Sequence, residues 1–149
     1  MSPTLERVAR TDAGLASELR VSVMRLRRRL AAEREPGNEL SVGALSVLGV
    51  LFRTGECTVG QLADHERVRP PSMTRTVNCL VDAGYVVRRS DEHDKRQVLV
   101  SISEQGKTIL LADRHRRDAW LAQRLRELAP HERAVLREAA PIIERLATS

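Results

Sequence analysis

The feature that most constrains this chain is a run of six ionisable residues, Asp91 to Arg96, between two segments rich in β-forming residues. The first segment is "YVVRRS" (85–90) and the second is "QVLVSIS" (97–103). In the second, one side of a strand would carry Val98, Val100 and Ile102, and the other Gln97, Leu99 and Ser101. This pattern predicts a β-hairpin with a charged tip. The remaining segments have helical spacing, so the expected fold class is mainly α with a small β element (α+β).

Two short helices with a turn between them are predicted directly before this hairpin. The segment "VGQLADHE" (59–66) has one apolar face, and "ERVRP" interrupts its pattern. Pro70 or Pro71 can begin the next helix, because a missing N–H costs nothing at a first position. The apolar face of this second helix comprises Met73, Val77, Leu80 and Val81. Gly84 supplies its stop signal.

The outer face of the second helix carries groups that can read DNA. At about 100° per residue, Arg75, Asn78 and Asp82 point away from the apolar stripe. Ser72 and Cys79 flank them, and Thr74 lies at the margin. Arginine can donate two hydrogen bonds to guanine, and asparagine can pair with adenine in the major groove. Taken alone, the same pattern also fits an ordinary amphipathic surface helix.

Helix, turn, helix and a two-stranded arm together predict a winged helix-turn-helix lobe over residues 40–103. In such a lobe the second helix enters the major groove, and the arm can place an arginine in the adjacent minor groove. Within the same lobe, Ser41 can cap a helix that runs to about Arg53 and ends before Gly55. That helix is apolar on all sides, from Val42 to Phe52, and is therefore expected to be buried.

Long amphipathic helices flank the lobe on both sides. The first, roughly 12–34, has an apolar stripe of Leu15, Leu19, Val23, Leu26 and Leu30. After the lobe, Ser103 can cap a helix over about 104–128, and Pro130 can begin another, in which Pro141 is expected to produce a kink. These helices enclose no core of their own. Segments 12–35 and 104–147 are therefore predicted to form a helical dimerisation layer.

Composition limits the class of protein further. A chain of 149 residues with 42% hydrophobic residues fits a single domain with a core, and 2% aromatics make that core aliphatic. "MSPTLERVARTD" is not a signal peptide, and no stretch has 18 uninterrupted apolar residues. We therefore expect a cytoplasmic protein with no membrane association and with reduced thiols. The net charge of +5 and the pI of about 10.2 permit nucleic acid as a partner without demonstrating it.

In these features the sequence resembles the MarR family of bacterial transcriptional regulators, over residues 12–147. The wing pattern of that family corresponds here to "DKRQVLVSISEQG" (94–106). Its recognition-helix pattern corresponds to "RPPSMTRTVNCLVDAGYV" (69–86). "TVGQLADHERV" (58–68) is similar to the first helix of the motif. The resemblance implies one MarR-type domain over 1–149, acting as a homodimeric repressor on double-stranded DNA. It also implies a pseudo-palindromic operator and release by a small-molecule effector.

The resemblance assigns roles to particular residues. Arg75 is similar to the recognition-helix arginine that reads bases, and Ser72 and Thr74 to positions that contact phosphates or bases. Asn78 joins them on the outer face. Arg96 matches the wing arginine that enters the minor groove. Asp94 matches the acid that orients basic groups in the wing, and Lys95, at the tip, can contact phosphate. No catalytic residue, metal site or cofactor is predicted.

Three alternatives remain open at this stage. Asp91, Glu92, His93 and Asp94 are metal-ligand types, and with His65, His115 or His131 they could serve a metal-dependent enzyme or a metal sensor. Oxidation of Cys79, beside the outer face, could disturb DNA binding. The two cysteines, Cys57 and Cys79, lack the spacing of metal ligands. The chain could also be an interaction module whose motif has lost DNA binding. The effector site is unknown, with Trp120, His115 and Met24 as weak candidates.

Overall fold

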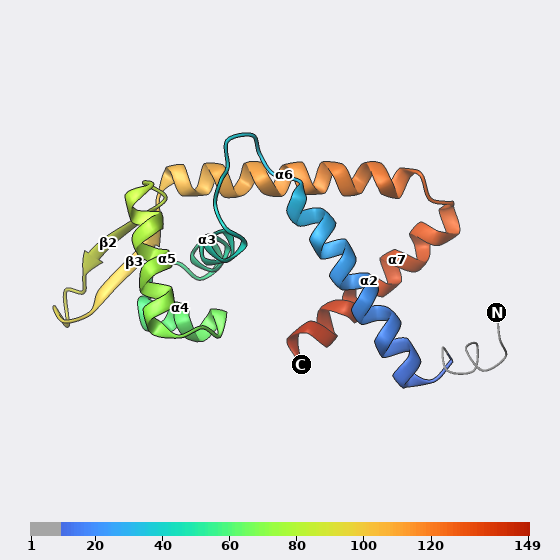
Figure 1. Ribbon diagram of the computed structural model, residues 1–149, viewed down its shortest axis with the longest axis horizontal. Coiled ribbons are helices and arrows are strands. Elements are labelled where there is room, and N and C mark those ends of the chain that lie inside the picture. The colour runs from blue at the N-terminus through green and yellow to red at the C-terminus, as the bar shows by residue number, and fades with distance from the viewer. Residues whose placement is uncertain (1–9) are drawn as a thin grey trace. The chain divides into compact units, whose positions relative to one another are not determined.

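The computed structural model describes residues 10–149; the predicted lack of a signal peptide concerns residues that lie partly outside this range. The chain divides into two compact units. One comprises Arg34–His115, and the other comprises the described residues before Arg34 together with Arg116–Ser149. Helix α6 (Glu104–Arg126) contributes residues to both units (Figure 1). Each unit is considered by itself.

The unit 34–115 contains the predicted winged helix-turn-helix. Its helices are α3 (Val42–Thr54), α4 (Val59–Glu66), α5 (Pro70–Asp82) and the first part of α6. Its strands are β1 (Cys57–Thr58), β2 (Val86–Ser90) and β3 (Val98–Ile102), which form an antiparallel sheet in the order β1-β3-β2. Val100 at the middle of β3 pairs with Cys57 on one side and Arg88 on the other. The predicted hairpin is thereby confirmed, and the short strand β1 pairs with its second strand.

Local signals explain where the helices begin and end. The Ser41 hydroxyl accepts a hydrogen bond from the Ala44 N–H at 3.1 Å, so it caps α3, and Gly55 ends that helix at a φ of +79°. Thr58 and Gln61 form a reciprocal capping box at the start of α4. Pro70 is the first residue of α5, and Gly84 follows its end at a φ of +81°. These helix boundaries agree with the sequence predictions to within a residue.

The core of this unit is aliphatic and draws on every element. Its buried members are Ala44, Leu45, Val47, Leu48, Val50, Leu51, Cys57, Leu62, Ala63, Met73, Val77, Leu80, Val86, Val100 and Leu110. The prediction that α3 is buried on all sides is wrong, because Ser46 in its middle is exposed as well as residues near its ends. Val42 is 48% exposed, and Phe52 is 40% exposed with the Arg114 guanidinium 5.3 Å from its ring centroid.

A buried polar contact holds the loop that precedes α3. Asp113 of α6 has no solvent exposure, and its carboxylate accepts hydrogen bonds from the Glu35 N–H at 2.8 Å and from Asn38 Nδ2 at 2.7 Å. Asn38 is also buried, and its Oδ1 accepts from the Leu40 N–H at 3.0 Å. Because buried polar groups must find partners, this contact fixes the course of residues 35–40.

The other unit consists of helices with exposed apolar faces. It contains α2 (Asp12–Ala32), the second part of α6 and α7 (Pro130–Thr148). Arg133 donates to the Leu128 carbonyl at 2.6 Å, and the Glu132 carboxylate accepts the Ala129 N–H at 2.8 Å, where alanine itself provides no cap. Among the described residues of this unit, Gly14 alone is buried. Leu15, Leu19, Val23 and Leu26 of the predicted stripe are 36–50% exposed.

Within residues 10–149, no helix combines the length and the apolar character that crossing a bilayer requires.

Candidate nucleic-acid interface

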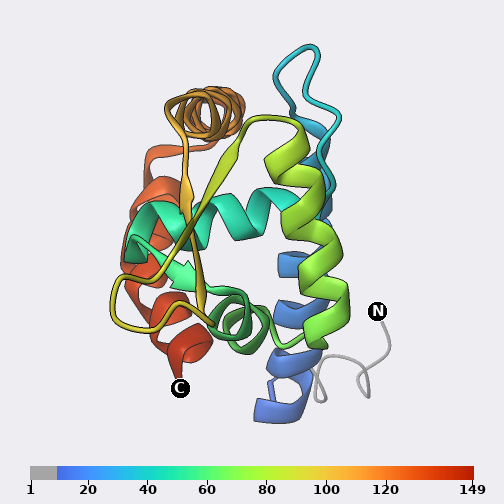
Figure 2. The same cartoon turned by 90° about the vertical axis from the view of Figure 1, so that its left-hand side faces the viewer.

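The outer face of α5 presents its polar side chains to solvent. Ser72, Thr74, Arg75 and Asn78 are all exposed, while Met73, Val77 and Leu80 on the opposite face are buried. The helix lies along one side of the unit, beside the strands of the hairpin (Figure 2). Arg75 forms no hydrogen bond or ion pair with another residue in the described part of the chain. Its guanidinium therefore keeps all its donors for an external partner.

The two hydroxyl groups near the start of α5 differ in what they can still offer. Thr74 Oγ1 donates to the Pro70 carbonyl at 3.0 Å, so its single hydrogen is already used. In this state Thr74 can accept a hydrogen bond but cannot donate one to a phosphate. The Ser72 side chain has no such partner among residues 10–149. Of the two, Ser72 is therefore the hydroxyl that is free to donate.

The N-terminus of α5 supplies little backbone hydrogen bonding for an anion. Pro70 and Pro71 lack an N–H, and the N–H groups of Ser72 and Met73 both donate to the Arg69 carbonyl. Phosphate contacts near this end would therefore rely on side chains. Arg67 and Arg69, which precede the helix, are both exposed. Sequence reasoning did not single them out, although basic residues directly before Pro70 were visible as "ERVRP".

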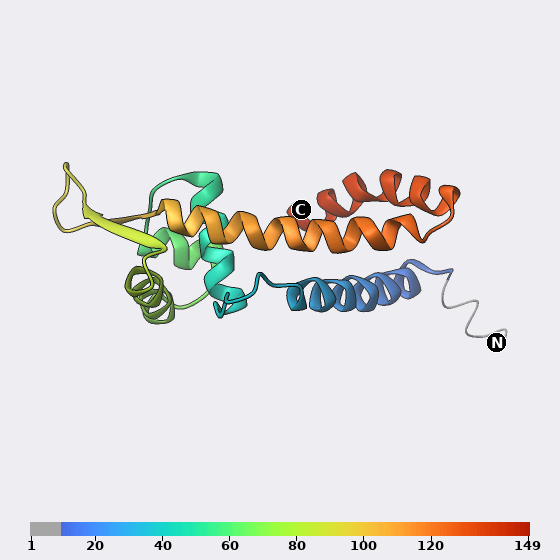
Figure 3. The same cartoon turned by 90° about the horizontal axis from the view of Figure 1, so that it is seen from above.

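The tip of the hairpin is shaped by its acidic residues. The Asp91 carboxylate accepts from the His93 N–H at 2.9 Å, and the Asp94 carboxylate accepts from the Arg96 N–H at 3.1 Å. Each is a local turn in which an aspartate holds the backbone two residues further on. Asp94 thus acts on Arg96 through its backbone. Lys95 and Arg96 are exposed at the tip, which projects away from the helices of this unit (Figure 3).

Consecutive arginines of β2 have different partners. Arg88 donates from Nη2 to Asn78 Oδ1 on α5. Arg89 binds the Glu56 carboxylate through Nε at 2.9 Å and Nη2 at 2.8 Å. The hydrogen bonds to Glu56 raise the pKa of Arg89 above its ordinary value, and the charges of Glu56, Glu92 and Asp91 act in the same direction. Sequence reasoning assigned no role to either arginine, because their partners are distant in the chain.

Positive charge on this face is concentrated on α5, the turn before it and β2 rather than at the tip. The tip segment 91–96 carries three acids and two bases, with His93 neutral. Outside the tip, the segment 67–90 carries one acid, Asp82, and the bases Arg67, Arg69, Arg75, Arg88 and Arg89. Arg89 is paired with Glu56, so the attraction of a polyanion would come mainly from the other four arginines.

The structure brings together no set of metal ligands in the described range. Residues 10–149 contain no group of three His, Cys, Asp or Glu side chains arranged to hold an ion, and His93 at the tip is exposed. The two cysteines are free thiols. Cys57 is buried, with its Sγ 3.3 Å from Thr54 Oγ1, and Cys79 is exposed on α5.

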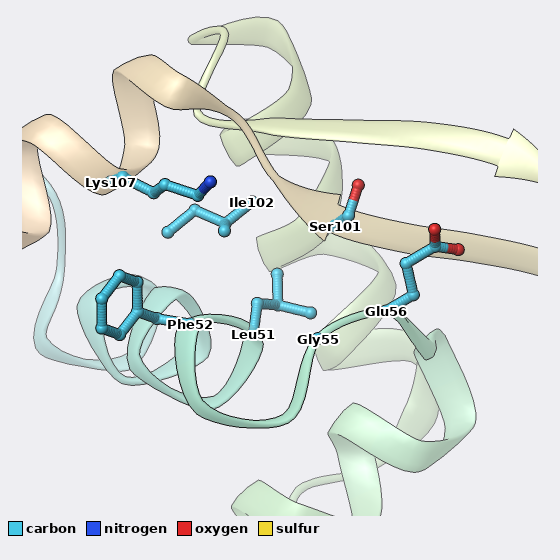
Figure 4. A pocket seen from close by; sticks show the side chains of 7 residues that line it. All are labelled: Leu51, Phe52, Gly55, Glu56, Ser101, Ile102 and Lys107. Atoms are coloured by element: carbon cyan, nitrogen blue, oxygen red, sulfur yellow. The ribbon is translucent and has the colours of Figure 1, made fainter.

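A pocket of about 400 Å³ lies within the unit 34–115. Its lining residues are Leu51, Phe52, Gly55, Glu56, Ser101, Ile102 and Lys107. Phe52 and Lys107 border one end, and Glu56 and Ser101 the other (Figure 4). The Lys107 amine is paired with Glu104 at 2.8 Å, and Glu56 with Arg89.

None of the three residues suggested from sequence as weak effector contacts lines this pocket. In the unit that contains α2, the guanidinium groups of Arg29 and Arg124 lie 4.6 and 5.6 Å from the Trp120 ring centroid. Met24 in the same unit is 49% exposed, and His115 at the end of the other unit is exposed.

Comparison with known proteins identifies the family. Residues 40–98 match the MarR family model. An HTH-type transcriptional regulator of Mycobacterium bovis is 48% identical over 133 residues, which cover 89% of this chain and 92% of the relative. A crystal structure from Pseudomonas aeruginosa, described as a transcriptional regulator protein, is 33% identical with a TM-score of 0.83, over 94% of this chain and 99% of that one.

The fold is also that of Streptococcus pneumoniae FabT, crystallised in complex with DNA, at 18% identity and a TM-score of 0.71, over 92% of this chain and 98% of FabT. Members of the family are regulators and not enzymes. The winged helix-turn-helix formed by α4, α5 and the β2–β3 hairpin is consistent with these similarities in fold. This chain belongs to the MarR family of transcriptional regulators.

Proposed function

We propose that this regulator binds a pseudo-palindromic operator in double-stranded DNA as a homodimer, represses transcription there, and is released by a small-molecule effector. The observation that carries the proposal is the outer face of α5, where Ser72, Arg75 and Asn78 are exposed next to the hairpin that bears Lys95 and Arg96. FabT, which shares this fold, was crystallised in complex with DNA. We place the operator-binding surface on α5 and the hairpin.

In this proposal Arg75 reads a base, because it is exposed and keeps all its donors. Ser72, with a free hydroxyl, donates to a phosphate, and Thr74 accepts from a base or from water. Lys95 contacts phosphate, and Arg96 enters the minor groove, where narrow A·T-rich DNA has the strongest negative potential. Asp94 orients Arg96 by holding its backbone N–H.

A homodimer is supported by the lack of a core among the described residues of the unit that contains α2 and α7. A helix with one apolar face must bury it to be stable in water. The exposed apolar side chains of these two helices include Leu15, Leu19, Val23, Leu26, Val135, Leu136, Ile142, Ile143 and Leu146. A second copy of the chain would cover such faces with closed two-fold symmetry and would supply the second recognition helix.

Release by a small molecule is supported by the pocket at the end of α3. Its volume lies within the range of about 300–1,000 Å³ typical of ligand sites. Leu51, Phe52 and Ile102 give it apolar walls, and Glu56 links it to Arg89 of β2. A ligand there would touch β3 and the residue that holds β2. Binding of the ligand would thus change the position of the hairpin.

The proposal is tested by fluorescence anisotropy with duplexes from the region upstream of the protein's own gene. We expect tight binding to one fragment, weaker binding to unrelated duplex, and a linear fall of log affinity with log salt concentration, because phosphate neutralisation releases counterions. Equal affinity for all duplexes, or binding that is insensitive to salt, would contradict the proposal. Compounds that release the bound fragment would then identify the effector.

A further inference from the structure

We infer that Arg88 of β2 is a specificity-determining residue that orients the amide of Asn78, and that Asn78 reads its base only while Arg88 holds it. The inference rests on the DNA-binding function proposed above and adds to it a residue from outside the recognition helix. It starts from one contact, the hydrogen bond from Arg88 Nη2 to Asn78 Oδ1, which links β2 to the outer face of α5.

The chemistry of the two side chains makes this contact directional. A guanidinium carries five N–H donors and no acceptor, whereas a primary amide has one acceptor oxygen and one donor nitrogen. Arg88 can therefore meet only the oxygen of Asn78. The contact fixes which way the amide is turned and leaves Nδ2 free to donate, with one lone pair remaining on Oδ1.

This orientation matters because base recognition by asparagine depends on it. A bidentate contact with adenine needs Nδ2 to donate to N7 and Oδ1 to accept from the N6 amino group. An exposed asparagine that is not held can turn its amide and rotate about its side-chain bonds, and fixing it at binding costs entropy. By holding the amide beforehand, Arg88 lowers that cost and favours one hydrogen-bonding pattern.

Position along β2 separates Arg88 from its neighbour. Successive residues of a strand point to opposite faces, and Arg88 lies towards α5 while Arg89 binds Glu56. Both residues are exposed and carry the same charge. Arg89→Ala is therefore a matched control, since it removes one positive charge from the same strand without touching Asn78.

The experiment measures base preference at every operator position by sequencing the bound fraction of a randomised library, for wild type, Asn78→Ala, Arg88→Ala, the double variant and Arg89→Ala. We expect Asn78→Ala and Arg88→Ala to reduce preference at the same base pair by about 5- to 150-fold. The double variant should lose no more than either single one. Arg88→Lys should restore part of the preference, and Arg89→Ala should leave it unchanged.

A role for Arg88 as a phosphate contact alone predicts a different result. Arg88→Ala would then weaken all sequences equally and lower the salt slope by about 0.9 per lost phosphate contact, with base preference intact. That result overturns the inference. The inference is also overturned if the two single variants lose base preference at different base pairs and the double variant shows both losses.

A measurement on the free protein separates failure of the inference from failure of the proposed function. Nitrogen-15 relaxation of the Asn78 side-chain amide should show a restrained group in wild type and a mobile one in Arg88→Ala. If wild type binds no DNA selectively, the proposed function fails. If the Asn78 amide is as mobile in wild type as in the variant, the orienting role of Arg88 fails whatever the DNA result.

Discussion

The guanidinium of Arg89 binds the carboxylate of Glu56 through two nitrogens, with N–O distances of 2.9 and 2.8 Å for Nε and Nη2. This pair joins β2 to the residue that precedes β1. It also neutralises one of the arginines of the hairpin. Glu56 is therefore an acid that limits the positive charge of the hairpin, in addition to lining the pocket.

Glu56→Gln should increase affinity for non-specific duplex DNA without changing base preference. The substitution leaves the Arg89 charge unpaired, so the slope of log affinity against log salt should become steeper, by at most about 0.9. Anisotropy titrations at several salt concentrations measure this. Glu127→Gln is the matched control, because Glu127 forms a comparable exposed pair with Arg124 on α6. Equal behaviour of the two variants would show that Glu56 does not restrain DNA binding.

Arg75→Ala should relax base preference at one operator position. The loss corresponds to about 1–3 kcal/mol of discrimination for one bidentate contact with guanine. Competition between the operator and single-base variants of it measures the effect. Arg53→Ala removes an exposed arginine from α3 and should leave the discrimination unchanged. Wild-type discrimination in Arg75→Ala would remove Arg75 from the reading surface.

Arg96→Ala and Lys95→Ala should have different effects although the residues are adjacent. Loss of Arg96 should weaken operators with A·T-rich flanks more than those with G·C-rich flanks, because the narrow groove attracts an inserted arginine. Loss of Lys95, which we propose contacts phosphate, should weaken both operators equally. Affinity for a pair of operators that differ only in the flanks separates the two. A uniform loss in both variants would place Arg96 outside the groove.

Leu19→Glu in α2 should convert the proposed homodimer to a monomer. Leu19 is 36% exposed in a single chain, and a charge there would have to be buried without a partner when two copies associate. Sedimentation velocity gives the molecular mass. Leu111→Glu introduces the same charge at a 46% exposed position of the unit 34–115 and should leave assembly intact. A dimeric Leu19→Glu protein would mean that this stripe is not the dimer surface.

Asp113→Ala should destabilise the protein by about 2–4 kcal/mol, since the Glu35 N–H and Asn38 Nδ2 would stay buried without their acceptor. Urea denaturation of the whole chain, followed by circular dichroism, measures the free energy of unfolding. Asp118→Ala, an exposed position on the same helix, should change stability by less than about 0.5 kcal/mol. A loss equal to that of the control would mean that the loop is held by other contacts.

The secondary structure could be predicted from the sequence because its signals are local. The cap at Ser41, the proline at the start of α5 and the glycine after its end act on residues within one turn of themselves. Alternation around Val100 likewise identified the second strand of the hairpin. Where the prediction was wrong, at Val42 and Phe52, apolar character was taken for burial, but burial depends on which faces of a helix the other elements cover.

The partners of the polar side chains were decided only by the tertiary structure. Arg88 and Asn78 are 10 residues apart in the chain, Arg89 and Glu56 are 33 apart, and Asn38 and Asp113 are 75 apart. Strand register and helix packing bring each pair together, and neither can be read from periodicity. The sequence by itself determined the winged helix-turn-helix and the family. The tertiary structure decided that Arg89 is paired with Glu56, that Arg88 donates to the side-chain amide of Asn78, and that Arg75 keeps its donors free.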